Sequence, residues 1–180
     1  MTPLAMIRIG HSPDADDAFM FYALAKKLIP TEGLHIVHVI DSIETLNQQA
    51  LAGELEVTAV SVAAYPLVAD RYALLPAGAS VGDQYGPVVV ALQPFSEGAL
   101  KGKRVGVPGA LTTATLALRL FEENVQLVPL PFEEIVPAVK RGDVEAGVVI
   151  HEAQLTYVQS GLHAVVDLGK WWFETTGHVL

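Results

Sequence analysis

Short apolar runs rich in β-branched residues alternate along this chain with segments whose apolar residues recur at helical spacing. This alternation constrains the fold more than any other feature, because strand–helix–strand units favour a mostly parallel sheet flanked by helices. We therefore predict an α/β fold. The predicted strands span 4–10, 34–40, 57–61, 86–93, 103–107, 125–130, 145–150 and 163–167, and the predicted helices span 15–28, 43–52, 62–69, 112–123, 132–141 and 152–160.

The segment 94–102, PFSEGALKG, interrupts the alternation and is rich in Pro, Gly and charged residues. Such a composition is typical of a linker. We therefore predict a first lobe at 1–93, a hinge at 94–102 and a second lobe at 103–168, with 169–180 starting a return to the first lobe.

A short echo in the sequence relates the two predicted lobes. Gly53-Glu54-Leu55-Glu56-Val57 ends a helix and opens a strand, and Gly142-Asp143-Val144-Glu145-Ala146 does the same. The echo is either an internal repeat or a helix–glycine–strand turn that both lobes happen to use.

The composition argues against several classes of function. The net charge of −9 repels phosphate backbones, so we expect no nucleic-acid partner. The absence of cysteine excludes disulfides, thiolate metal sites and cysteine nucleophiles. The longest apolar stretch, 57–69, is interrupted by Thr58, Ser61 and Pro66 and falls short of the roughly 18 residues of a membrane-spanning helix. Residues 1–10 lack the pattern of a secretory signal, so we expect a cytoplasmic protein with no membrane partner.

Polar residues after the strands are the candidate ligand contacts, because ligands of open parallel sheets bind beyond the carboxyl ends of the strands. His11-Ser12-Pro13-Asp14-Ala15-Asp16-Asp17 follows the first strand. Ser12 or Asp14 is suited to cap the next helix, and Ser12 and Asp16 are also candidates to contact a ligand. The segment does not fit a calcium loop, which requires a glycine and a distal glutamate.

Two further strand ends carry hydroxyl groups. Ser61 follows the strand at 57–61, where a serine is ordinarily a helix cap. Thr112 and Thr113 follow a glycine loop after the strand at 103–107 and open a helix. Free N–H groups at a helix start suit a carboxylate or phosphate, although simple capping is the alternative. The loop lacks both the Walker and the dinucleotide glycine patterns.

His151 follows the apolar strand at 145–150 and precedes a predicted helix. A histidine at a strand end is often structural, but the amino end of a helix disfavours a protonated imidazole. We therefore expect a neutral ring that can accept a proton, and His151 is the best candidate for a general base. His35 and His38 lie within a strand without the spacing of metal ligands. No metal or cofactor is predicted, and the sequence does not indicate an oligomeric state.

Several segments together resemble the 1,4-dihydroxy-6-naphthoate synthase family of the futalosine route to menaquinone. They are HSPDADDAFMFYAL at 11–24, VTAVSVAAY at 57–65, GVPGALTTATLAL at 106–118, GDVEAGVVIHEAQLTY at 142–157 and VVDLGKWW at 165–172. The resemblance implies a type 2 periplasmic-binding-protein-like fold with two lobes and a cleft between them. It also implies a cofactor-independent lyase that converts cyclic dehypoxanthinyl futalosine to 1,4-dihydroxy-6-naphthoate and releases dihydroxyacetone.

The resemblance also assigns roles to residues of this chain. His151 matches the proton-accepting histidine of the family. Ala59, Val60 and Ser61 match one substrate-contacting turn, and Thr112 and Thr113 match another, so that a small-molecule carboxylate is the expected partner. Family members continue past the WW segment and return to the first lobe, and we expect that remainder to be absent from a chain that stops at Leu180.

Two alternatives remain open at this stage. One is a small-anion binding protein of the same fold, which would explain the lobes and the anion-binding loop without chemistry. The other is chorismate dehydratase, a related enzyme of the same pathway.

Overall fold

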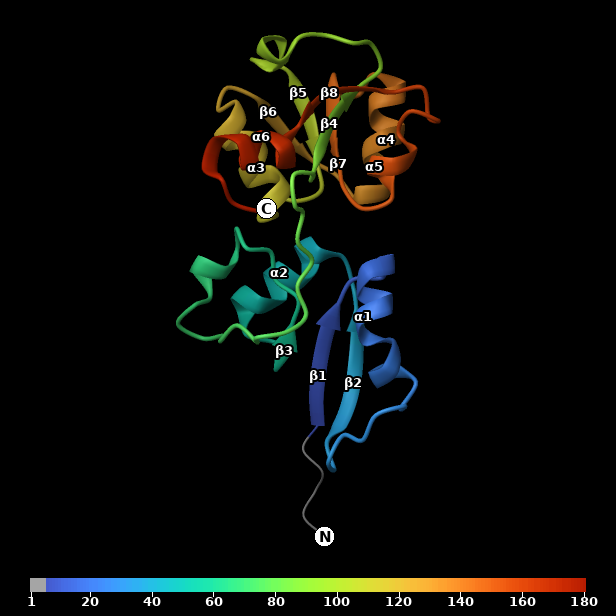
Figure 1. The fold of residues 1–180 in the computed structure, drawn as a ribbon, viewed down its shortest axis with the longest axis vertical. Coiled ribbons are helices and arrows are strands. Elements are labelled where there is room, and N and C mark those ends of the chain that lie inside the picture. The colour runs from blue at the N-terminus through green and yellow to red at the C-terminus, as the bar shows by residue number, and fades with distance from the viewer. Residues whose placement is uncertain (1–5) are drawn as a thin grey trace. The chain divides into compact units, whose positions relative to one another are not determined.

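A computed structural model describes residues 6–180 of the chain, which divides into two units, Met1–Ser80 and Val81–Leu180 (Figure 1). Both units combine strands and helices, so the prediction of a two-lobed α/β fold is confirmed. Leu4 and Ala5, the first residues of the first predicted strand, and residues 1–5 of the segment tested for a secretory signal lie outside the described residues. Among the residues from 6 onward, no helix has both the length and the apolar character needed to cross a bilayer.

The helices and strands follow one another in an order that matches the predicted alternation. In chain order they are β1 (Met6–His11), α1 (Ala15–Ala25), β2 (His35–Ile40), α2 (Ile43–Ala52), β3 (Val57–Thr58), β4 (Val88–Ala91), β5 (Arg104–Val107), α3 (Thr113–Phe121), β6 (Gln126–Pro129), α4 (Phe132–Arg141), β7 (Ala146–Val149), α5 (Ala153–Thr156), β8 (His163–Asp167) and α6 (Leu168–Thr176), with short 3₁₀ turns at Tyr65–Leu67 and Glu97–Leu100.

The first unit contains a three-stranded parallel sheet in the order β2-β1-β3. Helix α2 packs on this sheet, and the packing is so close that a β-carbon at Gly10 would lie 2.6 Å from Leu55 Cδ1 and 2.8 Å from Leu46 Cδ2. A side chain at this point of β1 would therefore require the Leu46 and Leu55 side chains to shift. Ser42 caps the start of α2 by accepting a hydrogen bond from Thr45 N at 3.2 Å.

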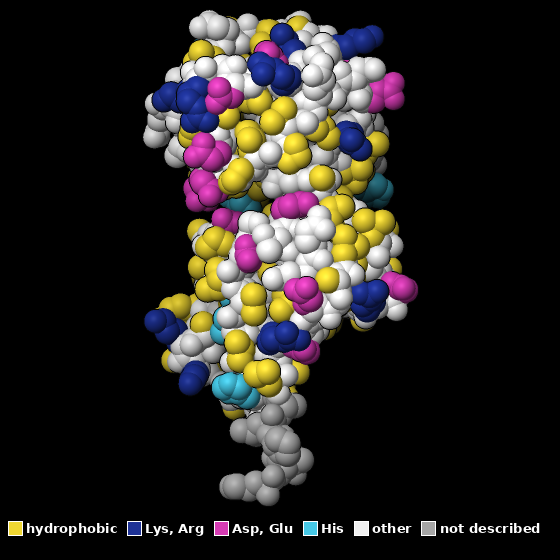
Figure 2. Space-filling view, turned by 180° about the vertical axis from the view of Figure 1, so that it is seen from behind, with side chains coloured by type: hydrophobic (Ala, Val, Ile, Leu, Met, Phe, Trp, Pro, Cys, Tyr) yellow, Lys and Arg dark blue, Asp and Glu magenta, His cyan; other side chains and the backbone are white. Residues whose placement is uncertain are grey.

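Helix α1 contributes little to the core of the first unit. None of its residues is buried, and the Phe19 side chain is 87% exposed. Hydrophobic side chains are visible between charged ones on the surface of both units (Figure 2). Within the described residues, the core of the first unit therefore depends mainly on α2 and the sheet.

The second unit contains a five-stranded mixed sheet in the order β6-β5-β7-β4-β8. Strands β6, β5 and β7 are parallel, and β4 is antiparallel to both of its neighbours. Successive side chains of a strand point to opposite faces, and Val89 of β4 packs with Leu118 of α3 and Leu168 of α6, whereas Val90 packs with Ile135 of α4. Helices α3 and α6 therefore cover one face of this sheet and α4 the other (Figure 1).

The structure corrects the predicted lobe boundaries. The strand predicted at 86–93 was assigned to the first lobe, but β4 pairs with β7 and β8 of the second unit. The predicted hinge at 94–102 instead connects two strands of one sheet, and its Leu100 is buried in that sheet's core. The two units divide between Ser80 and Val81.

Three other predicted segments also differ from the structure. The strand predicted at 57–61 is limited to two residues, and the helix predicted at 62–69 is a 3₁₀ turn. The segment 169–180 does not leave the second unit, since α6 packs against α3 and Leu180 N donates to Gly82 O at 3.1 Å.

The echo noted in the sequence is a structural repeat. The order β1-α1-β2-α2-β3 corresponds to β5-α3-β6-α4-β7, and the sheet order β2-β1-β3 corresponds to β6-β5-β7. Gly53 and Gly142 end equivalent helices with left-handed φ values of 71° and 77°. Two arginine–glutamate pairs are also equivalent, and they join Arg8 to Glu56 and Arg104 to Glu145.

Candidate functional site

In the second unit, the structure brings the predicted base and the threonine loop to one edge of the sheet. Strands β5 and β7 are adjacent and parallel, so their carboxyl ends lie side by side. Thr112 and Thr113 follow β5, and His151 follows β7. The two predicted segments therefore lie at the same sheet edge within a single unit.

Thr112 is a buried helix cap, with 3% of its surface exposed. Its Oγ1 donates to Gly109 O at 3.0 Å and accepts from Thr115 N at 3.3 Å. Thr115 Oγ1 donates to the same Gly109 carbonyl at 2.6 Å. The Thr112 hydroxyl is thus used inside the loop, and Thr113 is half-buried beside it. Any affinity of this helix start for an anion would come from its backbone N–H groups and dipole rather than from the Thr112 side chain.

His151 adopts a left-handed backbone conformation, with φ of 49°. This conformation is uncommon outside glycine, and residues held in it are found preferentially at functional sites. The ring is half-buried and meets Phe132, the first residue of α4, edge-on at 6.0 Å between centroids and 86° between planes. The helix that follows, α5, has only 4 residues, so its dipole is small and lends little support to the predicted helix effect on the ring.

In the first unit, the predicted residues lie at the corresponding edge. Strands β1 and β3 are adjacent and parallel, and Ala59 N donates to Gly10 O at 2.8 Å, which continues the pairing beyond β3. Ala59, Val60 and Ser61 are all half-buried. Ser12, which follows β1, therefore lies at the same sheet edge as this turn.

Ser12 is buried and is held in the turn before α1. Its N–H donates to Asp17 Oδ2 at 2.6 Å, and its Oγ accepts from Asp14 N at 3.2 Å. Ser12 therefore organises the start of α1 as a cap would. Asp16 is half-buried and lines an open hollow of about 370 Å³ with Phe19, Met20 and residues 78–80.

A histidine pair, with His11 buried and His38 half-buried, lies beside Ser12 and was not predicted. His11 is 6% exposed, its Nε2 lies 3.0 Å from His38 Nδ1, and its Nδ1 donates to Ser12 O at 3.0 Å. The His11 ring stacks on Phe21 at 4.5 Å. Desolvation lowers the pKa of His38, and the neighbouring His11 lowers it further. The feature that could have revealed this pair is the parallel pairing of β1 with β2. It places His11 and His38 on one face of the sheet as diagonal neighbours.

Asn47 is a second residue that the sequence analysis missed. It is fully buried on α2, and its side-chain amide forms two hydrogen bonds with Ser61. The available signal was an amide side chain among the apolar residues of the buried face of α2, which includes Leu46 and Ala50. A buried amide requires hydrogen-bond partners, and so Asn47 connects α2 to the turn after β3.

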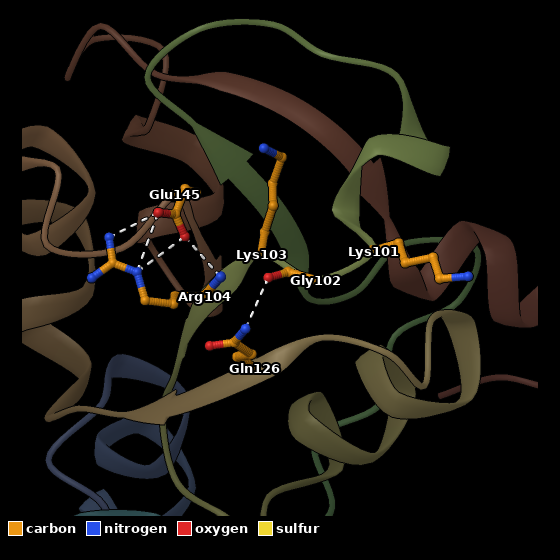
Figure 3. A pocket seen from close by; sticks show the side chains of 6 residues that line it. All are labelled: Lys101, Gly102, Lys103, Arg104, Gln126 and Glu145. Atoms are coloured by element: carbon orange, nitrogen blue, oxygen red, sulfur yellow. Dashed lines mark hydrogen bonds and ion pairs between the residues drawn. The ribbon is translucent and has the colours of Figure 1, made fainter.

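An open hollow of about 490 Å³ lies at the opposite, amino-terminal edge of the second sheet (Figure 3). Arg104, the first residue of β5, is bound there by Glu145 through its side chain and through its backbone N–H. This ion pair lowers the pKa of Glu145 to about 2. Lys103 lies over the Phe95 ring at 5.0 Å. Glu145 already neutralises the charge of Arg104. Ligands of α/β proteins bind at the carboxyl-terminal edge of the sheet, which is the opposite edge. The hollow is therefore not part of the candidate site.

Comparison with known proteins gives a family match and close relatives. The sequence profile of a family described as "Menaquinone biosynthesis" matches residues 7–180. Proteins from Thermus thermophilus and Streptomyces coelicolor, both named 1,4-dihydroxy-6-naphthoate synthase, are 44% and 41% identical over 171 and 177 residues, in each case 95% of this chain. The chain spans 62% of the length of each of these relatives.

Solved structures agree with this match. A crystal structure of a protein from Archaeoglobus fulgidus is 52% identical, with a TM-score of 0.92 over 97% of this chain and 65% of that one. The alkanesulfonate-binding protein SsuA from Xanthomonas axonopodis has a TM-score of 0.69 at 16% identity, over 91% of this chain and 61% of its own. The likeness to SsuA concerns the fold alone, and it confirms the predicted periplasmic-binding-protein-like architecture.

Proposed function

The chain belongs to the menaquinone biosynthesis family, and on this premise we propose that it converts cyclic dehypoxanthinyl futalosine to 1,4-dihydroxy-6-naphthoate and dihydroxyacetone. Support comes from two relatives named for this synthase at 44% and 41% identity. The observation that carries the proposal within the structure is the position of His151, held with a left-handed backbone at the sheet edge that it shares with the threonine loop.

His151 is the proposed general base. It takes a carbon-bound proton from the substrate, and a carbon–carbon bond then breaks. The departing three-carbon fragment takes up a proton, from the protonated imidazole or from water, to leave as dihydroxyacetone, and aromatisation of the product ring favours completion. The edge-on contact with Phe132 fixes the plane of the imidazole, and a base held in a fixed orientation loses less freedom on reaching the transition state. No cofactor is part of this proposal.

The substrate contacts are proposed from the same sheet edges. The backbone N–H groups at the start of α3, beside Thr112 and Thr113, are suited to the carboxylate of the naphthoate. Ala59, Val60 and Ser61 are proposed as further contacts, because they follow β3 at the carboxyl edge of the first sheet. Ser12 and Asp16 are proposed in a lesser role: Ser12 shapes the turn before α1 through its bonds to Asp14 and Asp17.

The proposal includes the setting in which the protein works. The partner is a small-molecule carboxylate, and the net charge of −9 disfavours nucleic acid. Because the substrate is an intermediate of intracellular biosynthesis, the proposed location is the cytoplasm.

Incubation of the purified protein with the cyclic futalosine tests the proposal directly. Release of dihydroxyacetone and of the naphthoate is expected, whereas a binding protein of the same fold would leave the compound intact. Chorismate is the comparison substrate, and loss of water from it would show a dehydratase instead.

The variant His151→Ala tests the assigned base. Its turnover number should fall roughly 10²- to 10⁴-fold, the usual contribution of a positioned base, while the affinity for the naphthoate changes much less. His163→Ala is the matched control, because His163 is an exposed histidine on β8 of the same unit. Equal activity of the His151→Ala and wild-type proteins would refute the assignment.

A further inference from the structure

Asn47 and Ser61 form a two-point contact inside the first unit. Asn47 Nδ2 donates to Ser61 Oγ at 3.0 Å, and Asn47 Oδ1 accepts from Ser61 N at 2.9 Å. Asn47 has no exposed surface. The two residues are 14 positions apart in the chain, so the contact ties the turn after β3 to the body of α2.

The orientation of the amide follows from chemistry. The backbone N–H of Ser61 can only donate, so the atom that faces it must be the amide oxygen. The NH₂ group then faces Ser61 Oγ, and because an NH₂ group can only donate, the hydroxyl oxygen must be the acceptor in that bond. This assignment leaves the hydroxyl hydrogen of Ser61 for another acceptor.

The rest of Ser61 is also fixed. Its carbonyl accepts from Ala64 N at 2.9 Å and from Tyr65 N at 3.1 Å. Within residues 6–180, no hydrogen bond of the protein uses the Ser61 hydroxyl hydrogen as its donor. The backbone and the oxygen of this half-buried residue are thus held in place, while its one remaining donor is directed away from Asn47.

We propose that Asn47 is a positioning residue that makes Ser61 a hydrogen-bond donor to an acceptor oxygen of the substrate. This inference rests on the proposed function, because it takes Ser61 as a substrate contact. It adds the polarity of that contact: the group opposite Ser61 is a carbonyl, carboxylate or ether oxygen and not an N–H. Asn47 does not touch the substrate in this proposal and acts only through Ser61.

The variant Asn47→Asp tests the polarity. A carboxylate in this place still accepts from Ser61 N, but its second oxygen accepts the hydroxyl hydrogen that the asparagine amide leaves to the substrate. The KM for the cyclic futalosine should rise roughly 3- to 10-fold, which is the range expected for one lost neutral hydrogen bond, with a smaller change in kcat. Gln48→Glu is the matched control, since it makes the same change of charge on the exposed side of α2 and should leave KM unchanged.

A double-mutant cycle separates positioning from a merely structural role. Ser61→Ala removes the donor itself and should raise KM by a similar factor, and Ser61→Thr, which keeps a hydroxyl, should restore most of the affinity. Adding Asn47→Asp to Ser61→Ala should change KM less than about twofold further, because the hydroxyl that Asn47 orients is already absent. If the factors by which Asn47→Asp and Ser61→Ala each raise KM multiply in the double variant, the inference is overturned. An unchanged KM in Asn47→Asp would overturn it as well.

The outcomes distinguish this inference from the function on which it rests. A wild-type protein that releases no dihydroxyacetone refutes the proposed function and removes the inference with it. An active wild-type protein whose variants show multiplying factors refutes only the inference. If Asn47→Asp does not fold, Asn47→Ser replaces it, since the short serine side chain loses both bonds to Ser61. Adding Asn47→Ser to Ser61→Ala should likewise raise KM by less than the product of the two single effects.

Discussion

Gly147 and Gly106 face each other on adjacent strands of the second unit, and they offer a matched pair of substitutions. Gly106 of β5 pairs in register with Gly147 of β7. A β-carbon at Gly147 would lie 2.5 Å from Ile135 Cγ2 and 3.0 Å from Val139 Cγ2 on α4. A β-carbon at Gly106 would have Leu130 Cδ1 as its nearest neighbour, at 3.2 Å, with other atoms at ordinary contact distance.

These distances predict different effects on stability for two chemically identical substitutions. Ile135 has no exposed surface and cannot move into solvent, so Gly147→Ala must displace α4. Overpacking of this kind costs about 1–3 kcal/mol. For a chain of this size that corresponds to a fall in Tm of roughly 2–12 °C. In Gly106→Ala the end of the Leu130 side chain has only a few tenths of an ångström to move, and the lower entropy of the unfolded chain offsets that cost by about 0.4–1 kcal/mol.

Differential scanning calorimetry of the two variants beside the wild type measures the effect. Gly147→Ala should also lower turnover, because α4 begins with Phe132, the residue against which the His151 ring rests. Gly106→Ala should leave both Tm and turnover close to wild type. Equal shifts in Tm for the two variants would refute the packing argument, as would a Gly147→Ala protein of wild-type stability.

Two further predictions concern pH and follow from the ionisable pairs of the two units. Desolvation lowers the pKa of His38 below its ordinary value of 6.5. As the pH falls, this histidine is therefore protonated in the unfolded chain before it is protonated in the folded one, which favours unfolding. The contribution of His38 to stability is complete above about pH 6.5 and is lost as the pH falls. Urea denaturation should show a smaller decrease between about pH 7.5 and pH 5.5 for His38→Gln than for wild type, whereas His35→Gln, at an exposed position of the same strand, should behave like wild type. Arg104 lowers the pKa of Glu145 from 4.5 to about 2, so the contribution of this pair is present above pH 4.5 and is lost as the pH falls towards 2. Acid titration followed by circular dichroism should show less loss over that range in Glu145→Gln, and an identical profile would contradict the assignment.

Local sequence signals predicted much of the secondary structure. The predicted bounds of α2, α4 and β8 are confirmed. The two helices were predictable because capping residues mark their ends: Ser42 begins α2, Gly53 ends it, and Gly142 ends α4. The placement of β4 was wrong because the neighbours of a strand are set by pairing with β7 and β8, which lie far away in sequence. Nothing in the composition of 94–102 distinguishes a loop within a sheet from a linker between units.

The candidate site shows the same division between local and distant information. The rule that ligand-binding residues follow parallel strands selected Thr112, His151 and Ser61, and the family resemblance is confirmed by the match over residues 7–180. The His11–His38 pair and the contact of Asn47 with Ser61 were missed, because each joins residues on different elements, 27 and 14 positions apart. Their detection required the register of the sheet and the packing of α2.

The repeated plan of the two units has a consequence for the history of the chain. Its two copies agree at the amino-terminal sheet edge, where Arg8 with Glu56 and Arg104 with Glu145 form the same pair. They differ at the carboxyl-terminal edge, where one copy carries an amide-anchored serine and the other an imidazole. Duplication of one ancestral module, followed by divergence of the two copies, would leave such a shared ion pair at one sheet edge and different residues at the other.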